Sequence, residues 1–386
     1  MNEALPLDGT RILDLTRLLP GGYATMLFAS LGAEVVKVEE PERGDYMRWF
    51  PPLVDDYGAM FHAINGGKKS IKLNLKTGTG REVFLTLAAK ADVVIEGNRP
   101  GVTDKLGIGY KDVAEVNPGI VYCSVSGFGQ DGPYVDKVGH DINYMGYAGA
   151  LGQSENPCIP GVQAADLAGA MMCVISVLGA LLGRERTGTG QYIDVSMHHV
   201  VVSWLALEIS KCLGHAPAPS AATNLFTGAY PCYSVYETAD GAHLSVGALE
   251  IKFWRTLCQS VGREDLIDEQ FASGQRAAEV KASLNDLFKT KTRDEWLDLL
   301  GDKECCVGPV YELPEVLIDP HVIARNLIGR EPKSGVNRVK FPAVFSRAKT
   351  SHIEPAPKFG EHTDEILAGI GYTEEQIEML RAEGVI

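Results

Sequence analysis

Two carboxylates and one histidine lie where side chains could transfer protons. Asp166 directly precedes the apolar stretch that begins at Leu167. It could therefore cap a helix N-terminus, where backbone N–H groups need an acceptor. The same position stabilises the ionised carboxylate, which could then act as a base or a nucleophile. The position of Asp166 leaves both roles open.

His140 and Glu250 are the other two candidates. His140 lies between Gly139 and Asp141 at the start of a predicted helix, so a neighbouring cap could simply orient it. Glu250 follows a predicted hairpin and could be an exposed acid in the first turn of a helix. An imidazole and a carboxylate together could also work as an acid–base pair near neutral pH.

A cluster of basic residues precedes and follows two predicted strands. One interpretation is a solvated face with alternating charges. The other is a cationic pocket at the carboxyl ends of parallel strands, where open α/β sheets bind ligands, suited to a phosphorylated carrier. The cluster consists of Lys68, Lys69, Lys72, Lys76, Arg81, Arg99 and Lys105.

The composition is that of a soluble globular protein and excludes several classes. The 386 residues include 36 Lys and Arg and 50 Asp and Glu, a net charge of −14, which disfavours nucleic acid and anionic membranes as partners. Eight cysteines without CxxC spacing predict reduced thiols and a cytoplasmic protein. We expect the one long apolar stretch, Leu167–Gly183, to be a buried helix rather than a membrane span.

Short apolar segments alternate with amphipathic ones through the first half of the chain, a pattern typical of a Rossmann-like α/β domain with a parallel sheet. The predicted strands are Arg11–Leu15, Glu34–Val38, Ser70–Leu75, Asp92–Glu96, Ile120–Ser126 and Gln191–Val195. The predicted helices are Tyr23–Leu31, Thr79–Ala91, Asp141–Leu151, Leu167–Leu182 and Val200–Leu213.

The following region has the pattern of a smaller α+β domain. Ala239-Asp240-Gly241 predicts a hairpin between strands Cys232–Glu237 and Ala242–Val246. Predicted helices follow at Ile251–Val261, Ala277–Thr290 and Thr292–Leu300, and a capping box at Thr373 opens one more. We expect a large domain over 1–213, a linker over 214–224, a small domain over 225–330 and a return segment over 331–386.

Several common catalytic motifs are missing. The loop Thr16–Gly22 lacks the spaced glycines of a dinucleotide site, although Glu39 lies near the position of a ribose-binding acid. Gly66–Ser70 precedes a strand and fails as a Walker motif, and no GxSxG elbow occurs. No metal-ligand spacing is found, so we expect no metal site.

The sequence resembles the family III CoA-transferase superfamily (CaiB/BaiF type), which includes the α-methylacyl-CoA racemases, nearly from end to end. The matching segments are Arg11-Ile-Leu-Asp-Leu, Leu31-Gly-Ala-Glu-Val-Val-Lys-Val-Glu, Asn98-Arg-Pro-Gly-Val, Leu106-Gly-Ile-Gly-Tyr, Gly139-His-Asp-Ile-Asn-Tyr144, Thr187-Gly-Thr-Gly-Gln191 and Gly360-Glu-His-Thr-Asp-Glu-Ile-Leu367.

This resemblance implies an acyl-CoA thioester as the substrate and no permanently bound cofactor. It implies a Rossmann-like large domain completed by the C-terminal tail, plus a small domain. It also implies an interlocked homodimer whose active site lies between the large domain of one chain and the small domain of the other. A hetero-oligomer with a non-catalytic partner subunit is a further alternative.

Two chemistries occur in the superfamily. In transferases an aspartate, matched here by Asp166, attacks the thioester and forms a mixed anhydride. In racemases the same aspartate faces a histidine, matched by His140, and the two exchange the α-proton of a 2-methylacyl-CoA. The segment around His140 resembles the racemase version, in which Asp141 and Glu250 would pair.

The resemblance and the basic cluster together predict the CoA contacts. Many family members have an arginine directly after the second strand, whereas this chain has Glu40, for which Arg43 could compensate. The predicted CoA-binding residues are Arg43, Ile64, Lys68, Lys69, Asn98, Arg99, Lys105, Gly139 and Tyr144.

Overall fold

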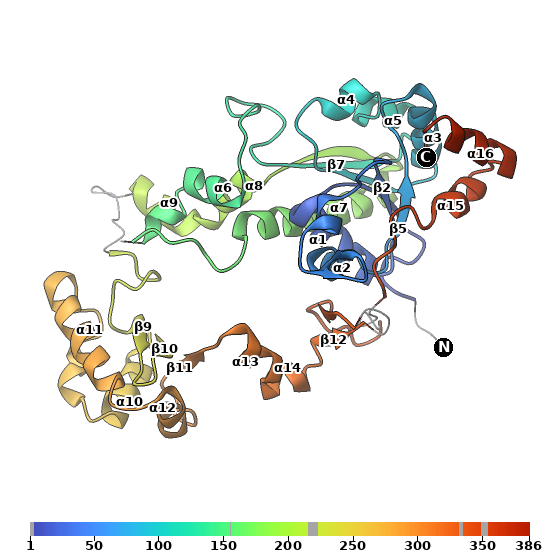
Figure 1. The fold of residues 1–386 in the computed structure, drawn as a ribbon. Helices are drawn as coiled ribbons and strands as arrows, with labels where there is room; N and C mark the ends of the chain where they lie inside the picture. Colours follow the sequence, from blue (N-terminus) through green and yellow to red (C-terminus); the bar gives the residue numbers. More distant parts are fainter. Residues whose placement is uncertain (1–3, 155, 215–222, 332–334, 349–353) are drawn as a thin grey trace. The chain divides into compact units, whose positions relative to one another are not determined.

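The computed structural model describes residues 4–154, 156–214, 223–331, 335–348 and 354–386. The chain forms two compact units (Figure 1). The first comprises residues 1–148, 161–203 and 322–386, and the second comprises 149–160 and 204–321. These boundaries differ from the expected ones. The second unit includes residues 149–160 and 204–213, which were expected in the large domain, and the first unit includes residues 322–330, which were expected in the small domain. Most of the expected linker, residues 215–222, lies outside the described residues.

The first unit contains a six-stranded sheet in which every neighbouring pair is parallel, as predicted. Its order is β5-β2-β1-β6-β7-β8, so each connection between parallel strands crosses over through a helix or a longer segment. The strands are β1 (Arg11–Leu15), β2 (Glu34–Glu39), β5 (Lys69–Lys72), β6 (Val93–Glu96), β7 (Val121–Ser126) and β8 (Gln191–Ser196).

Helices cover this sheet (Figure 1). They are α1 (Leu18–Ser30), α2 (Ala59–Ile64), α3 (Gly78–Ala88), α4 (Val102–Leu106), α5 (Tyr110–Val116), α6 (Asp141–Ala148), α7 (Ala164–Thr187), α8 (Met197–Trp204), α15 (Thr363–Gly369) and α16 (Glu374–Ala382). Shorter elements are η1 (Tyr46–Trp49) and the strand pairs β3 (Leu53–Val54) with β4 (Tyr57–Gly58) and β12 (Ile328–Arg330) with β13 (Asn337–Val339).

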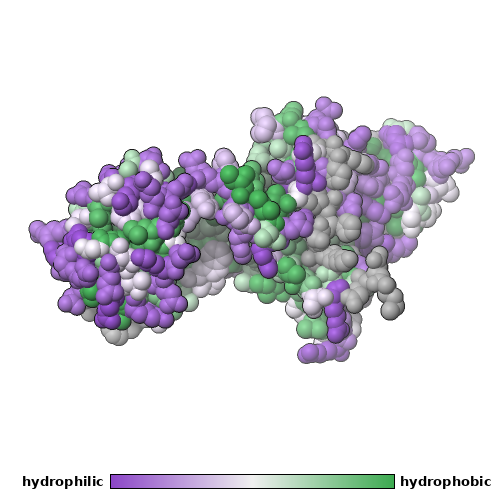
Figure 2. Space-filling model, turned by 90° about the horizontal axis from the view of Figure 1, so that it is seen from below, coloured by the Kyte–Doolittle hydropathy of each residue, from purple (hydrophilic) through white to green (hydrophobic). Residues whose placement is uncertain are grey.

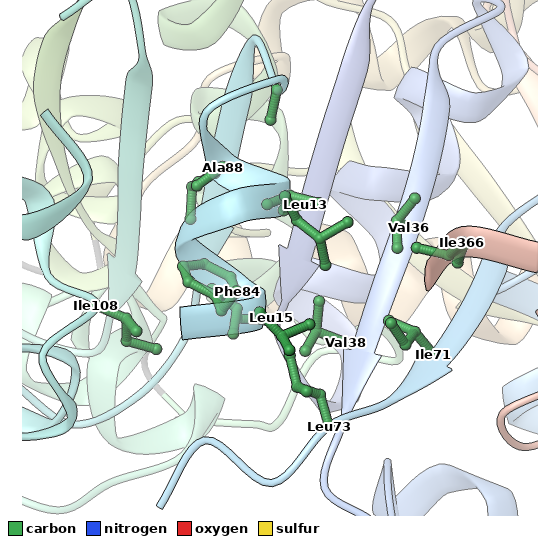
Figure 3. Packing of buried hydrophobic residues seen from close by; sticks show 14 of the residues in the cluster. Leu13, Leu15, Val36, Val38, Ile71, Leu73, Phe84, Ala88, Ile108 and Ile366 are labelled. Atoms are coloured by element: carbon green, nitrogen blue, oxygen red, sulfur yellow. The ribbon is translucent and has the colours of Figure 1, made fainter. Parts of the chain in front are cut away.

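The C-terminal tail completes the first unit, as the resemblance implied. The backbone N–H of His362 donates to the carbonyl of Ser70 at 2.9 Å, which attaches the tail to β5. Side chains of α3 and α15 share one apolar core with the strands (Figure 3), and α16 contributes Ile377 and Leu380 to it. Leu13, Phe84 and Leu367 are among its fully buried members.

Helix α7 is longer than predicted and begins earlier. Its N-cap is Gln163, so Asp166 lies in the first turn, and of the two roles left open for Asp166 the structure excludes the cap. Among the described residues, α7 is the one helix with the length and apolar composition to cross a membrane. Here it packs against α1, α6, β7 and β8, but Ile175 and Leu182 are exposed, so the helix is buried in part and not throughout as predicted.

The second unit is the smaller α+β unit. The predicted hairpin is confirmed: β9 (Tyr233–Glu237) pairs antiparallel with β10 (His243–Gly247), and β11 (Val307–Val310) joins β10. Gly241 has a φ of 76° in the turn, which explains the glycine there. The other elements are η2 (Leu151–Gln153), α9 (Ala206–Gly214), α10 (Ile251–Ser260), η4 (Glu264–Glu269), α11 (Gly274–Phe288), α12 (Arg293–Leu300), α13 (Leu313–Ile318) and α14 (Pro320–Ala324), whose last residues lie past the boundary.

The prediction of one continuous helix over Val200–Leu213 is wrong. The apolar stretch Val200–Leu213 forms two helices, α8 and α9, with Leu205 between them. The periodicity continues across Leu205, so the apolar pattern alone gave no signal of the interruption.

Candidate active site

Helices α6 and α7 meet at a single carboxylate. Asp141, the first residue of α6, is buried, and its Oδ1 accepts the backbone N–H of Ala165 at 2.6 Å and of Asp166 at 3.1 Å. The first amides of a helix have no partner within that helix, and a carboxylate there also interacts favourably with the helix dipole. Asp141 therefore fixes the start of α7 and the backbone of Asp166.

Asp166 has a strongly perturbed acidity. Burial, and to a lesser degree the charge of Asp141, raise the pKa of its carboxyl to about 6, although the charge of His140 opposes both. Asp166 is half-buried, so its carboxyl is still accessible. A carboxyl with this pKa can hold or release a proton near neutral pH, which an ordinary aspartate cannot do.

His140 is exposed directly before α6. Its backbone is fixed by Asn143: the His140 N–H donates to Asn143 Oδ1 at 3.0 Å, and the His140 carbonyl accepts the Asn143 N–H at 2.8 Å. Its charge acts on Asp166. The structure thus brings His140, Asp141 and Asp166 together in the first unit. Glu250 belongs to the second unit, where it is the N-cap residue of α10.

Tyr144 supports this loop from α6. Its buried hydroxyl donates to the carbonyl of Gly139 at 2.5 Å. Burial, and then the charges of Asp166 and Asp141, raise its pKa to about 12, so the hydroxyl stays protonated. A Cβ on Gly127 would lie 2.5 Å from the Tyr144 ring, which explains why glycine occupies that position.

Aromatic side chains surround the loop before His140, and two of them, Phe128 and Tyr134, were not predicted from the sequence. Phe128 packs against Tyr134, Tyr144 and Tyr147 with ring centroids 5.2 to 5.5 Å apart. Lys137 lies over two of these rings. The signal available in the sequence was a run of aromatics in and after the Gly-rich segment 127–139, which by itself indicated only a break in the α/β alternation.

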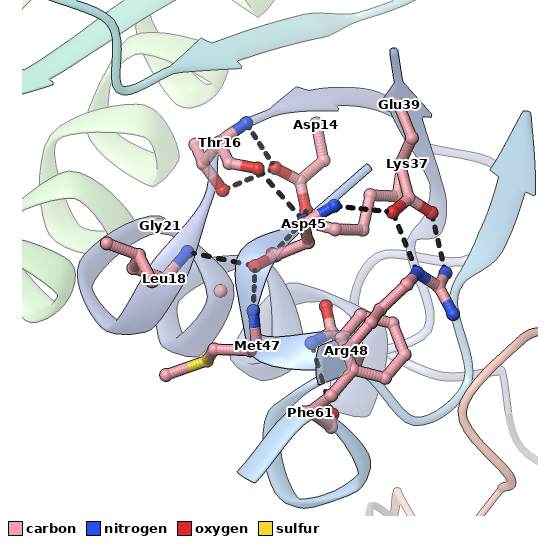
Figure 4. Close-up of polar contacts among 12 residues, drawn as sticks. Asp14, Thr16, Leu18, Gly21, Lys37, Glu39, Asp45, Met47, Arg48 and Phe61 are labelled. Carbon is pink, nitrogen blue, oxygen red and sulfur yellow. Dashed lines mark hydrogen bonds and ion pairs between the residues drawn. The ribbon is translucent and has the colours of Figure 1, made fainter. Parts of the chain in front are cut away.

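Buried charges occupy the carboxyl ends of β1 and β2 (Figure 4). The ammonium of Lys37 lies 2.8 Å from Asp45 Oδ2 and 3.9 Å from Asp14 Oδ2, and all three side chains are buried. Burial lowers the pKa of Lys37, but the charges of Asp14, Asp45 and Glu39 outweigh it and raise the pKa to about 12. Lys37 therefore stays charged and ties both strands to the segment before η1.

Glu39 is equally engaged. Arg48 donates to its two carboxylate oxygens at 2.8 Å and 2.6 Å, and the Ser70 hydroxyl donates to it at 2.6 Å. The Arg48 guanidinium also lies 3.9 Å from the centre of the Phe61 ring. The acid that sequence position suggested for a ribose thus has a structural role, joining β2 to η1 and β5.

Two lysines of the predicted cationic pocket have carboxylate partners. The Lys68 ammonium is buried 3.3 Å from Asp14. Burial lowers its pKa to about 8 although the Asp14 charge opposes this. Lys69 pairs with Glu34 at 3.1 Å and with Glu365 at 2.8 Å. Both lysines therefore have carboxylate partners within the chain, and their contact with CoA stays a prediction.

The other predicted CoA residues have varied surroundings. Ile64 is buried, and the amide of Asn98 donates to Glu96 at 3.2 Å. Glu40 accepts the backbone N–H of Arg43 at 2.8 Å and so shapes the turn after β2. The exposed cations of the predicted set are Arg43, Arg99 and Lys105.

The described residues contain no group of three or more His, Cys, Asp or Glu side chains that could hold a metal ion. A separate pocket of about 470 Å³ lies in the first unit. Its lining includes Tyr110 and Tyr192, but none of the predicted site residues. The candidate active site therefore rests on the α6–α7 pair and not on this pocket.

The sequence profile of CoA-transferase family III matches residues 7–363. The chain is 34% identical to succinyl-CoA:glutarate CoA-transferase of Mus musculus, over 99% of this chain and 90% of that one. It is 32% identical to α-methylacyl-CoA racemase of Homo sapiens, over 99% of this chain and 98% of that one. A crystal structure of a CaiB/BaiF family protein from Brucella suis superposes with a TM-score of 0.83 and 32% identity, covering 95% of this chain and 100% of that one.

The chain therefore belongs to CoA-transferase family III, and it has the fold of that family. It is an enzyme of the family III type, for which an acyl-CoA substrate is expected. Relatives of similar identity are named as CoA-transferases and as racemases.

Proposed function

We propose that the protein is an acyl-CoA racemase that exchanges the α-proton of a 2-methylacyl-CoA through His140 and Asp166. The observation that carries this proposal is the contact between the side chain of Asp141, the residue after His140, and the backbone of Asp166, together with an Asp166 pKa that is raised to about 6. The proton next to a thioester is weakly acidic, so racemisation needs a base on one face of the carbon and a donor on the other. The exposed imidazole and the half-buried carboxyl supply two such groups.

The bond changes are few. One of the two groups takes the α-proton, the thioester carbon and oxygen carry the resulting enolate, and the other group returns a proton to the opposite face. The thioester is never cleaved, and CoA is part of the substrate rather than a resident cofactor. Backbone amides near the start of α6 would stabilise the enolate oxygen, while Asp141 holds Asp166 in position.

Deuterium exchange tests this directly. A 2-methylacyl-CoA incubated with the enzyme in D₂O should gain deuterium at the α-carbon, detected by mass spectrometry, with no acceptor acid present. His140→Ala and Asp166→Asn should each reduce the exchange rate at least about a hundredfold. Absence of exchange across a broad panel of acyl-CoAs, or full activity in His140→Ala, would reject the racemase.

The second candidate is a CoA-transferase in which Asp166 attacks the thioester. The names of several relatives favour it, and so does the accessibility of the Asp166 carboxyl. This reaction needs a free carboxylic acid as acceptor and proceeds through an acyl-aspartyl anhydride. Hydroxylamine should then trap an acyl-enzyme at Asp166, and transfer should survive in His140→Ala. A chain that binds CoA and catalyses neither reaction would instead fit the non-catalytic partner subunit.

We also propose that two copies of the chain assemble. Figure 2 shows hydrophobic residues reaching the surface in patches on the face displayed. Ile175 and Leu182 on α7 and Leu207 and Leu213 on α9 are each more than half exposed, and such apolar surface usually marks an interface. In the interlocked arrangement implied by the family, Glu250 of the partner subunit would act at Asp141. Light scattering after gel filtration should report a dimer, and a monomer would contradict the proposal.

All eight cysteines are free thiols, which fits the predicted cytoplasmic location.

A further inference from the structure

Lys137 is a cation next to exposed apolar side chains that come before and after His140 in the sequence. Lys137 precedes His140 by three residues, and its ammonium lies 4.2 Å from the centre of the Tyr134 ring and 4.5 Å from that of Tyr147. It also donates to the Tyr147 hydroxyl at 2.8 Å. Within the described part of the chain, no carboxylate forms an ion pair with Lys137. Its charge therefore remains available to an anion.

The surface around Lys137 is apolar and open. Val138, next to Lys137 in the chain, is 68% exposed, and the two tyrosines whose rings contact Lys137, Tyr147 and Tyr134, are 51% and 37% exposed. When a ligand covers large apolar side chains that are this exposed, the apolar surface leaves water, which makes the free energy of binding more favourable. Phe128 connects this surface to the candidate active site, because its ring packs on Tyr147 at 5.5 Å and on Tyr144 at 5.2 Å, and the Tyr144 hydroxyl donates to the carbonyl of Gly139, the residue before His140.

We propose that this surface, formed by Tyr134, Lys137, Val138 and Tyr147, binds the acyl part of the substrate, and that Lys137 selects acyl groups that carry a second, distal carboxylate. The methylene groups of such a ligand would cover the apolar side chains, and its carboxylate would meet the ammonium. Two tyrosine rings beneath the ammonium hold it in place. This inference rests on the acyl-CoA chemistry proposed above but not on the choice between racemase and transferase.

Two substrates that differ only at the distal end test it. In 2-methylsuccinyl-CoA a carboxylate replaces the terminal methyl group of 2-methylbutanoyl-CoA, while the α-carbon, its methyl group and CoA are the same. We expect the enzyme to prefer the dicarboxylic thioester by about tenfold or more in kcat/KM, the gain of one charge-assisted hydrogen bond. Turnover is measured as α-deuterium exchange and, with a free acid present, as CoA transfer.

The variants locate the preference. Lys137→Met keeps the length of the side chain and removes the charge, so the ratio of the two kcat/KM values should fall about tenfold. Lys137→Arg keeps the charge and should retain most of the ratio. Lys90→Met, at an exposed lysine outside the site, should leave the ratio unchanged.

The outcomes separate the possibilities. No preference in the wild type, or an equal loss for both substrates in Lys137→Met, would overturn the inference; the equal loss would assign Lys137 to the CoA part, which the two substrates share. Turnover of neither thioester by either route would count against the proposed function instead.

Discussion

Asp141 acts on Asp166 in two separable ways. Its Oδ1 accepts two backbone N–H groups at the start of α7, which is a matter of position. Its negative charge adds to burial in raising the pKa of Asp166, which is a matter of acidity. A substitution that keeps the acceptor oxygen and removes the charge distinguishes the two.

In Asp141→Asn the amide oxygen can still accept from Ala165 and Asp166, while the charge is gone. Removing a negative charge lowers the pKa of a neighbouring carboxyl, so the Asp166 pKa should fall below about 6. The limb of the pH–kcat profile that reports Asp166 should therefore move to lower pH. Asp136→Asn, an exposed carboxylate nearby in sequence, is the control and should not move the limb. An unmoved limb in Asp141→Asn would show that Asp141 acts only through position.

At the scale of elements, strands β1 and β2 and the segment before η1 are held together by buried charges (Figure 4). The sequence places Asp14, Lys37 and Asp45 on three different segments. Only the sheet register, in which Asp14 lies opposite Lys37, brings them into contact. Removing the cation would leave two buried carboxylates with less compensation.

We expect Lys37→Met to lower the free energy of unfolding by about 3–5 kcal/mol, the usual cost of leaving a buried charge uncompensated. Lys69→Met removes a partly exposed lysine from its pairs with Glu34 and Glu365 and should cost less than about 1 kcal/mol. Urea denaturation of both variants measures the difference. Similar losses in the two variants would contradict the structural role assigned to Lys37.

At the scale of the whole molecule, the buried carboxylates make the free energy of unfolding depend on pH. Burial raises the pKa values of Asp14, Glu39 and Asp45, but the charges of Lys37, Lys68 and Arg48 outweigh it, and all three pKa values lie below the ordinary 3.8 for Asp and 4.5 for Glu. A group whose folded pKa is lowered contributes stability above its unfolded pKa, and this contribution disappears as the pH falls through the folded value.

The urea concentration at the midpoint of unfolding should therefore stay constant between pH 7 and 5 and fall steeply below about pH 4.5. Asp166, whose pKa is raised to about 6, and Glu96, whose pKa is raised by burial, work in the opposite direction, but they are two groups against three. In Lys37→Met the decline should be shallower, because Asp14 and Asp45 lose the charge that lowers their pKa. A midpoint that stays constant down to pH 3 would contradict this account.

Much of this molecule could be predicted from local patterns. The six strands of the parallel sheet, the antiparallel hairpin and the Thr373 capping box are where period, turn residues and caps placed them, because those signals act over a few neighbouring residues. The family could be identified for a similar reason, since its motifs are short and contiguous. The residues His140, Asp141 and Asp166 were also named from sequence.

Only the tertiary structure determined which groups pair with the charged side chains. From sequence alone, Lys68 and Lys69 were predicted to bind CoA, and the position of Asp166 left a helix cap and a catalytic role open. In the fold Lys68 is buried against Asp14, Lys69 pairs with Glu34 and Glu365, and Asp141 takes the capping role. These contacts join residues 24 to almost 300 positions apart. Coulomb interactions depend on distance in space and on burial, and neither is written in the order of residues along the chain.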